Sequence, residues 1–314
     1  MSSFLNSVSA VLVILLLTAT GYYCAYRGYL KEEGKMFISK FLLRLCIPFM
    51  IIYTFQTSFT VDSLKAAGNG LLACFITCSL NIICSFILMR FMHLPRRQKG
   101  VFLMLSAFSN AIFIGYPMCL ELFGESCVEH VMVYYMVGTT YTQTLANSVM
   151  RYSGSSGDLF SADSVKGLLT TPAIISILIA VTLMLLNIRL PELVLTTFKY
   201  MSNCVTPLAL VLTGYILYSI GLKGLRLDKT IIIALLVRFI LSPATALLVC
   251  RFLGIDGLFR SVIVVESAMP APSQTVVFAT EYGADDTLAA RGCSISTLLS
   301  FIEIPLIMLV LNTL

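Results

Sequence analysis

The sequence SNAIFIGYP at residues 109–117 determines how the rest of the chain is interpreted. It lies inside an apolar stretch from about residue 100 to residue 123, long enough for a helix to cross a bilayer. Its centre nevertheless holds Asn110, Gly115 and Pro117. Proline removes a backbone donor and clashes with the preceding turn, so a break in the helix is expected. Non-helical backbone at membrane depth is tolerated only where protein or a water-filled cavity covers it. The alternative is a simple proline kink packed against neighbouring helices.

The composition indicates a polytopic membrane protein. Apolar residues make up 58% of the 314 residues and charged residues 12%, whereas soluble domains have about 45–50% and about 25%. The net charge of +5 is therefore assigned to cytoplasmic loops and not to nucleic-acid binding. Ten cysteines are scattered without a CxxC pair, so no metal site or cofactor is expected. A disulfide between Cys119 and Cys127 is disfavoured.

Hydropathy predicts ten membrane-spanning helices joined by short loops. The first segment lacks a basic leader region and an A-x-A site, so it is expected to be retained as a helix. The expected spans are 8–27, 36–58, 66–90, 99–123, 127–150, 168–187, 197–221, 229–253, 258–281 and 288–312.

The distribution of Lys and Arg predicts the orientation. With the N-terminus outside, fourteen of these residues lie at inner loops and five at outer ends. Positive residues gather on the cytoplasmic side, so both termini are expected outside a bacterial cytoplasmic (inner) membrane.

The polar stretch 151–167 reads as a cytoplasmic linker that divides the chain into two halves, 1–150 and 168–314. Five helices in each half make the second half inverted relative to the first. The halves also correspond in sequence: GVF at 100–102 matches GLF at 257–259, and SAMPAPSQ at 267–274 breaks the ninth helix as SNAIFIGYP breaks the fourth. Interrupted helices at corresponding positions of two halves are a pointer to a transporter site, although chance placement of prolines is the alternative.

Several motifs carry a family resemblance. NAIFIGYP at 110–117 is similar to an N-x-x-F-x-G-x-P pattern, and PLAL at 207–210 is followed by Gly214. AMP at 268–270 precedes ATEYG at 279–283, and STLLS at 296–300 precedes Pro305. With these motifs the chain resembles, nearly end to end, the auxin efflux carrier family, whose bacterial members include malate and malonate permeases.

The resemblance implies an all-α membrane protein with ten transmembrane helices in two inverted five-helix repeats. Helices 4 and 9 would be broken and would cross at the substrate site, as in NhaA-type antiporters and bile-acid symporters. A panel-like scaffold would hold a mobile core, and the substrate would be an organic anion such as an auxin-like acid or a dicarboxylate. The sequence departs from the family pattern at Ile112, Gln274 and Glu303.

Polar residues inside the spans are the candidate site residues. An uncharged amide can donate two hydrogen bonds to a carboxylate, which makes Asn110 the first candidate, against a helix–helix hydrogen bond as the alternative. Gln143 and Asn147 are four residues apart and are expected to share a helix face, either in the cavity or in a packed seam. The expected substrate-binding residues are Asn110, Ala111, Gly115, Pro117, Gln143, Asn147, Pro270, Pro272, Ser273 and Gln274.

Charged residues at depth form a second group of candidates. An intramembrane acid is a functional hypothesis by default, so Glu266, with Ser267 and Thr275, is a candidate for H⁺ or Na⁺ coupling. Arg238 is expected either to pair with Glu266 or to attract anions from the cavity wall. Glu303 has no assignable partner. Arg44 and Glu121 are expected near helix ends, where long side chains reach the interface.

The sequence therefore predicts a secondary transporter for a small organic anion that works by alternating access, with no enzymatic activity. A bile-acid-type Na⁺-coupled symporter is the first alternative. A membrane-embedded enzyme and a sensory module are alternatives from other classes, although no HExxH, GxSxG or P-loop motif occurs. Coupling by H⁺, by Na⁺ or by no ion stays open, as does a homodimeric state.

Overall fold

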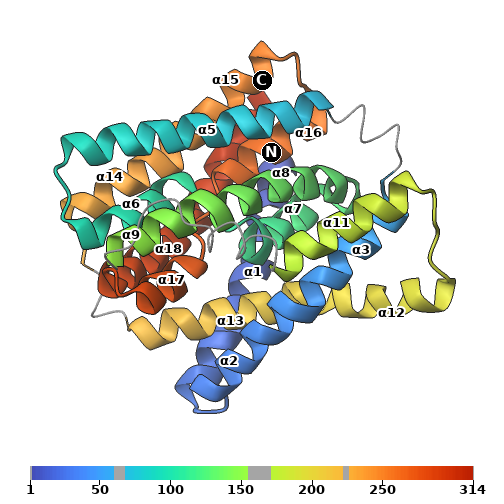
Figure 1. The fold of residues 1–314 in the computed structure, drawn as a ribbon, viewed down its shortest axis with the longest axis horizontal. Helices are drawn as coiled ribbons and strands as arrows, with labels where there is room; N and C mark the ends of the chain where they lie inside the picture. Colours follow the sequence, from blue (N-terminus) through green and yellow to red (C-terminus); the bar gives the residue numbers. More distant parts are fainter. Residues whose placement is uncertain (1, 60–67, 155–170, 222–225, 314) are drawn as a thin grey trace.

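The computed structural model describes residues 2–59, 68–154, 171–221 and 226–313, and these residues form helices and loops without a strand (Figure 1). Elements labelled α in the next sentence are α-helices, and those labelled η are short turns of another helix type: η1, η2, η4 and η6 are π-helical and η3 is 3₁₀-helical. The elements are α1 (Ser2–Tyr26), α2 (Glu32–Phe41), η1 (Leu42–Cys46), α3 (Ile47–Thr57), α5 (Gly68–Phe91), α6 (Arg96–Ala107), η2 (Ala111–Gly115), α7 (Tyr116–Phe123), η3 (Glu125–Cys127), α8 (Val128–Tyr141), η4 (Thr142–Ala146), α9 (Asn147–Gly154), α11 (Pro172–Leu185), α12 (Glu192–Asn203), α13 (Val205–Ile220), α14 (Lys229–Leu236), η6 (Val237–Leu241), α15 (Ser242–Phe252), α16 (Gly257–Ser267), α17 (Gln274–Tyr282) and α18 (Asp286–Thr313).

Seven helical stretches among the described residues are long and apolar enough to cross a membrane. They are Val8–Tyr26, Glu32–Thr57, Gly68–Phe91, Arg96–Phe123, Glu192–Ser219, Lys229–Phe252 and Asp286–Thr313. The predicted all-helical membrane class is thereby confirmed, whereas ten spans in two inverted repeats stay a prediction. Of the predicted linker 151–167, residues 151–154 belong to α9 and the others lie outside the described residues.

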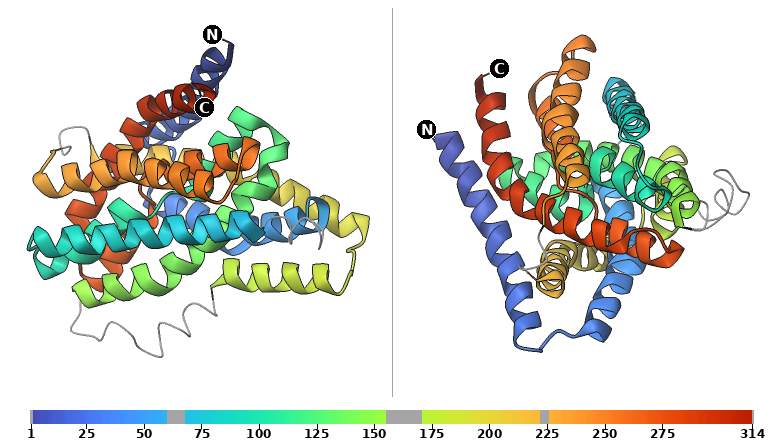
Figure 2. Two further views of the ribbon diagram at one scale, coloured as in Figure 1. Left: turned by 90° about the horizontal axis from the view of Figure 1, so that it is seen from above. Right: turned by 90° about the vertical axis from the view of Figure 1, so that its left-hand side faces the viewer.

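Contacts between helices fall into two sets. One set, here called the panel, consists of α1, α2–η1–α3, α11, α12 and α13, which pack mainly on one another. The other set, here called the crossing bundle, consists of α5 to α9 and α14 to α18 with their π and 3₁₀ turns. The sets meet chiefly where α1 packs on α18 and α7, and where α13 packs on η2. Figures 1 and 2 show the panel helices α2, α3, α12 and α13 grouped on one side of the molecule.

The longest contact inside the panel depends on two glycines. A Cβ on Gly21 of α1 would collide with the backbone of Val211 in α13, and a Cβ on Gly214 would collide with the backbone of Thr18. Small residues let helix backbones approach closely in membranes, where lipid gives no hydrophobic drive for association. The close packing of α1 on α13 therefore follows from these residue types.

Three π-helical turns come directly before prolines. Pro48, Pro117 and Pro243 follow η1, η2 and η6, and each proline lacks the N–H that would bond the carbonyl four residues earlier. The helix widens instead, and the N–H of the residue before each proline donates five residues back, as from Tyr116 to the carbonyl of Ala111. Hydropathy alone does not reveal these one-residue insertions.

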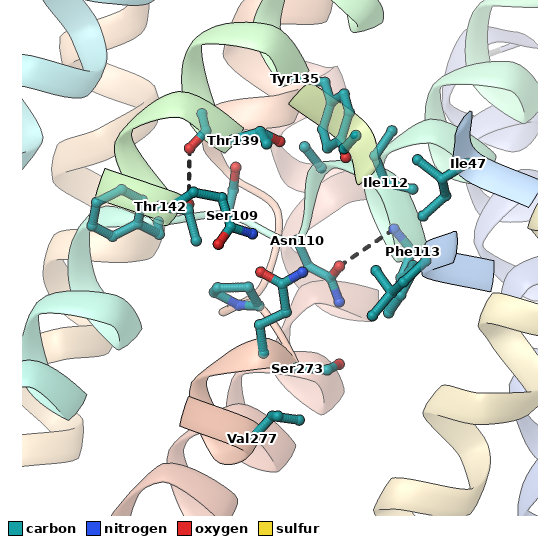
Figure 3. Close-up of a pocket in the computed structure, with 18 of the residues that line it drawn as sticks. Ile47, Ser109, Asn110, Ile112, Phe113, Tyr135, Thr139, Thr142, Ser273 and Val277 are labelled. Atoms are coloured by element: carbon teal, nitrogen blue, oxygen red, sulfur yellow. Dashed lines mark hydrogen bonds between the residues drawn. The ribbon is translucent and has the colours of Figure 1, made fainter. Parts of the chain in front are cut away.

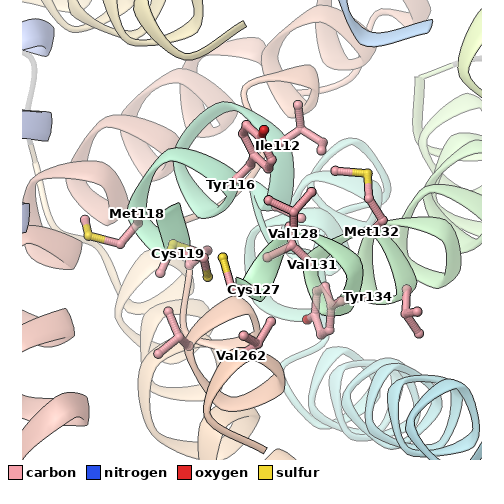
Figure 4. Packing of buried hydrophobic residues seen from close by; sticks show 14 of the residues in the cluster. Ile112, Tyr116, Met118, Cys119, Cys127, Val128, Val131, Met132, Tyr134 and Val262 are labelled. Atoms are coloured by element: carbon pink, nitrogen blue, oxygen red, sulfur yellow. The ribbon is translucent and has the colours of Figure 1, made fainter. Parts of the chain in front are cut away.

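Apolar packing fills the molecule on one side of the break in the fourth predicted span. Tyr116 and Cys119 of α7 face Val128 and Val131 of α8 and Val262 of α16, and all are buried (Figure 4). Cys119 and Cys127 are free thiols, so the disfavoured disulfide is absent between them. This cluster packs α7 against α8 and α16.

Candidate functional site

The two interrupted stretches meet in the middle of the molecule. The helix that starts at Arg96 ends at Ala107 and resumes at Ala111, and the helix that starts at Gly257 ends at Ser267 and resumes at Gln274. The N–H of Asn110 donates to the carbonyl of Pro270 at 2.8 Å, which joins the two interruptions directly. Four helix ends therefore converge at one place.

Asn110 caps the resumed helix η2–α7. Its Oδ1 accepts a hydrogen bond from the N–H of Phe113 at 3.3 Å, and the residue is only 6% exposed (Figure 3). The side-chain Nδ2 is buried and has no partner among the described residues. A buried amide donor without a partner costs about 1–3 kcal/mol, so this group is poised for an acceptor that binds here.

A cavity of about 320 Å³ lies next to Asn110, between the panel and the crossing bundle. Ser109, Tyr135, Thr139, Thr142 and Ser273 supply polar groups to its wall, as Figure 3 shows. The panel contributes residues from α2, η1, α3, α11 and α13, and the bundle contributes residues from α5, from the two interruptions and from α8, η4 and α17. The described lining residues are Lys35, Ser39, Leu43, Arg44, Ile47, Cys78, Ala107, Phe108, Ser109, Asn110, Ala111, Ile112, Phe113, Tyr134, Tyr135, Gly138, Thr139, Thr142, Gln143, Thr171, Pro172, Ala173, Leu212, Ile216, Pro272, Ser273, Gln274, Val277 and Phe278.

The cavity extends to one side only of the interruptions. Its lining runs from Asn110 towards Lys35, near the start of α2, and Thr171, just before α11. On the other side lies the apolar cluster of Figure 4, with Tyr116 and Val131 buried.

The structure brings six of the ten expected substrate-binding residues to the cavity wall. They are Asn110, Ala111, Gln143, Pro272, Ser273 and Gln274. Gly115, Pro117, Asn147 and Pro270 do not line it. Gln143 lies in the π turn η4, which has more residues per turn than an α-helix. Residues four apart therefore do not share a face there as they would in a regular α-helix, and Gln143 lines the cavity whereas Asn147 does not. Pro270 takes part through its carbonyl, which anchors Asn110.

Arg238 has backbone partners in both interrupted helices. The side chain is 1% exposed, and its guanidinium donates to the carbonyl of Ser106 at 2.8 Å and to that of Ser267 at 3.2 Å. A further, longer bond reaches the carbonyl of Met269 at 3.5 Å. These carbonyls belong to the C-terminal ends of α6 and α16 and lack helical donors, and a cation is favourable there. Arg238 thus holds the crossing together; it forms no ion pair with Glu266 and does not line the cavity.

Glu266 lies behind the crossing and outside the cavity wall. It is fully buried, and its Oε1 accepts from the thiol of Cys119 at 3.6 Å, while Oε2 has no partner among the described residues. A Cβ on Gly115 would collide with this carboxyl, which explains the glycine at that position. Ser267 and Thr275 turn their hydroxyls onto the carbonyls of Val264 and Pro272.

The sequence interpretation missed the cations of the cavity wall. Arg44 lies in the middle of Glu32–Thr57 and not near a helix end, so the expectation that it reaches the interface there is wrong. Lys35 and the polar residues Tyr135, Thr139 and Thr142 were also missed. The sequence did carry a signal for Arg44: it precedes Pro48 by four residues and so lies in the helical turn that the proline disturbs.

Comparison with known proteins gives a consistent result. A family model described as a membrane transport protein matches residues 6–308. An uncharacterized transporter of Methanocaldococcus jannaschii is 28% identical over 304 residues, covering 95% of this chain and 97% of that protein. An uncharacterized transporter of Methanothermobacter thermautotrophicus is 27% identical over 306 residues, covering 96% and 98%. Both alignments span the two interruptions and the whole cavity wall.

Proposed function

The chain belongs to the membrane transport protein family, the family of the auxin efflux carriers, and is an integral membrane protein. From this premise we propose that it is a secondary transporter that carries a small organic anion by alternating access. The observation that carries the proposal is the one-sided cavity at the meeting point of two interrupted helices.

The chemistry of the cavity suits an anion. The unpartnered Nδ2 of Asn110 is a donor, and the resumed helices η2–α7 and α17 begin at the cavity wall with Ala111 and Gln274. The first N–H groups of a helix have no acceptor within it, and the N-terminus carries partial positive charge. A carboxylate placed between these groups would gain hydrogen bonds that the protein alone leaves unmade.

The position of the cavity suits alternating access. It is bounded by the panel on one side and the crossing bundle on the other, and the apolar cluster around Tyr116 closes its far end. Movement of the bundle against the panel would open the closed end and shut the open one. In this proposal residues 1–150 and 168–314 form two inverted five-helix repeats, with 151–167 as the cytoplasmic linker, and both termini lie outside.

The coupling ion is a separate part of the proposal. Glu266 is the candidate for H⁺ coupling, because it is a fully buried carboxyl that touches the same crossing from behind. A bile-acid-type Na⁺ symporter is the alternative, and a strict Na⁺ requirement for uptake would favour it. An enzyme, the alternative from another class, would need a nucleophile–base pair or metal ligands at the cavity wall.

Uptake into proteoliposomes tests the proposal. The purified chain is reconstituted and given labelled phenylacetate, malonate and malate, each with and without Na⁺ or a pH gradient. We expect saturable uptake of at least one acid, competed by the unlabelled compound and absent from protein-free liposomes. If none of a broad panel of mono- and dicarboxylates enters above that background, the proposed substrate class is wrong.

A further inference from the structure

Arg44 occupies an unusual position for a charged residue. It follows Glu32 by twelve residues and precedes Thr57 by thirteen, in a stretch that is otherwise apolar enough to span the bilayer. A charge at the centre of a spanning helix costs about 2.5–3.5 kcal/mol on insertion scales and needs water or a counter-charge. Its side chain is exposed and lines the cavity, so water in the cavity solvates it.

The turn that holds Arg44 explains why it reaches the cavity. Pro48 cannot donate to the carbonyl of Arg44, and the chain responds with the π turn Leu42–Cys46, in which Ile47 donates to Leu42. Leu42 and Cys46 are buried, whereas Arg44 is not. Turns of this kind occur often at functional sites, because they direct a side chain that a regular helix would place elsewhere.

The charge balance of the cavity is positive. Among the described lining residues two are basic, Lys35 and Arg44, and none is acidic. Lys35 already forms an ion pair with Glu32 at 2.7 Å, and Glu32 also accepts from Tyr215 at 3.0 Å. Arg44, in contrast, has no ion pair or hydrogen bond within the described chain. The cavity therefore contains one cation, Arg44, for which the described residues provide no counter-charge.

Arg44 and Asn110 occupy corresponding positions along their helical stretches. Asn110 follows Arg96 by fourteen residues and precedes Phe123 by thirteen, so both lie at the middle of their stretches. Arg44 belongs to the panel and Asn110 to the crossing bundle, and both line the same cavity. Apolar side chains line the same cavity, among them Ile47, Ile112 and Val277 (Figure 3).

We propose that Arg44 is the residue that selects the anion: its guanidinium binds the carboxylate of the substrate from the panel side, opposite Asn110. The planar guanidinium of Arg matches a carboxylate with two parallel hydrogen bonds, which Lys cannot reproduce. The apolar body of the substrate then contacts the side chains between the two polar walls. This inference rests on the proposed function and names the group that sets its charge selectivity.

The test compares acids with their uncharged amides. Binding of phenylacetate and phenylacetamide, and of malonate and malonamide, is measured by thermal shift and by competition of uptake for the wild type, Arg44→Gln, Arg44→Lys and Lys40→Gln. Lys40 lies one turn from Arg44 on the same helix and does not line the cavity, so its variant controls for loss of a charge. We expect the wild type to prefer an acid over its amide by tenfold or more.

In Arg44→Gln the preference for the acid should disappear, with affinity for the acid reduced at least tenfold and affinity for the amide unchanged. Arg44→Lys should fall between the two, and Lys40→Gln should match the wild type. If Arg44→Gln folds, transports and still prefers the acid as the wild type does, the assignment of Arg44 is wrong while the transporter proposal stands. If the wild type neither binds nor carries any acid, the proposed function fails first.

Discussion

Two arginines, Arg44 and Arg238, lie well inside helical stretches long enough to cross a membrane, and their surroundings differ in burial and in hydrogen-bond partners. Arg238, in the crossing bundle, is 1% exposed and donates to backbone carbonyls at the ends of α6 and α16. Arg44, in the panel, lines the cavity and has no partner within the described residues. The same side chain therefore serves the fold in one region and is left free for a ligand in the other.

The difference shows how to separate structural charges from functional ones in a membrane protein. A buried guanidinium is tolerated where helix breaks leave carbonyls without donors, because the cation replaces the missing hydrogen bonds. A guanidinium in a wet cavity has no such role; water solvates it while the cavity is empty, and it remains available to an anion. Proline takes part in both cases: Pro270 and Pro272 follow the end of α16, whose Ser267 carbonyl accepts from Arg238, and the turn before Pro48 holds Arg44.

The largest expected difference between the two arginines is in the free energy of unfolding when each is replaced with methionine. Arg238→Met removes the bonds to Ser106 and Ser267 and leaves their carbonyls buried without donors, so we expect a loss of about 3 kcal/mol or more in unfolding free energy. Arg44→Met should change stability by less than about 0.5 kcal/mol, because no bond is lost. Thermal unfolding of the detergent-purified proteins measures both. Equal stability of the two variants would contradict the distinction.

A smaller effect is expected at the contact between the two halves of the crossing. In Gly115→Ala the new Cβ collides with the carboxyl of Glu266, which is fully buried and has little room to move. Overpacking of this kind costs about 1–3 kcal/mol, and the displaced η2 turn should also reduce uptake. Gly68→Ala is the matched control, since nothing lies within 4 Å of its Cβ. Unfolding curves that coincide for the two variants would show that Glu266 does not press on Gly115.

The smallest expected effect concerns sodium. The guanidinium of Arg238 already occupies the carbonyls of Ser106, Ser267 and Met269, where a bound cation would otherwise be stabilised at the ends of two helices. Replacing Na⁺ by choline should therefore change the initial rate of uptake by less than twofold. Rates measured at fixed ionic strength and fixed membrane potential provide the check. A loss of uptake without Na⁺ would instead favour the symporter alternative.

Much of the fold follows from simple sequence signals. Hydropathy predicts the helical class, and Pro270 with Pro272 predicts where α16 stops and α17 begins. Pro117 marks the π turn η2, which follows the break after α6. Asn110 was predicted as a site residue from its position beside such a stop, and it lies on the cavity wall. These signals are local, because a missing N–H acts on the turn in which it lies.

What the sequence did not show depends on neighbours distant in the chain. The expected pairing of Arg238 with Glu266 compared two charges, whereas the actual partners are carbonyls whose freedom depends on where other helices end. The turns η1 and η4 are π-helical and have more residues per turn than an α-helix, which changes the directions of the side chains they hold. Arg44 in η1 lines the cavity, and Asn147, directly after η4, does not. A period of 3.6 residues does not detect such insertions.

The most direct test of the crossing as the substrate site is saturable uptake by Asn110→Ala. Asn110 contacts both interruptions: its N–H donates to Pro270, its Oδ1 caps the N–H of Phe113, and its buried Nδ2 has no partner among the described residues. Alanine keeps the first of these and removes both groups of the side chain. We expect uptake of the carried acid to fall to the level of protein-free liposomes, while the thermal unfolding midpoint stays within a few degrees of the wild type. Uptake with unchanged KM and maximal rate in a folded Asn110→Ala protein would contradict the claim that the substrate binds at the crossing.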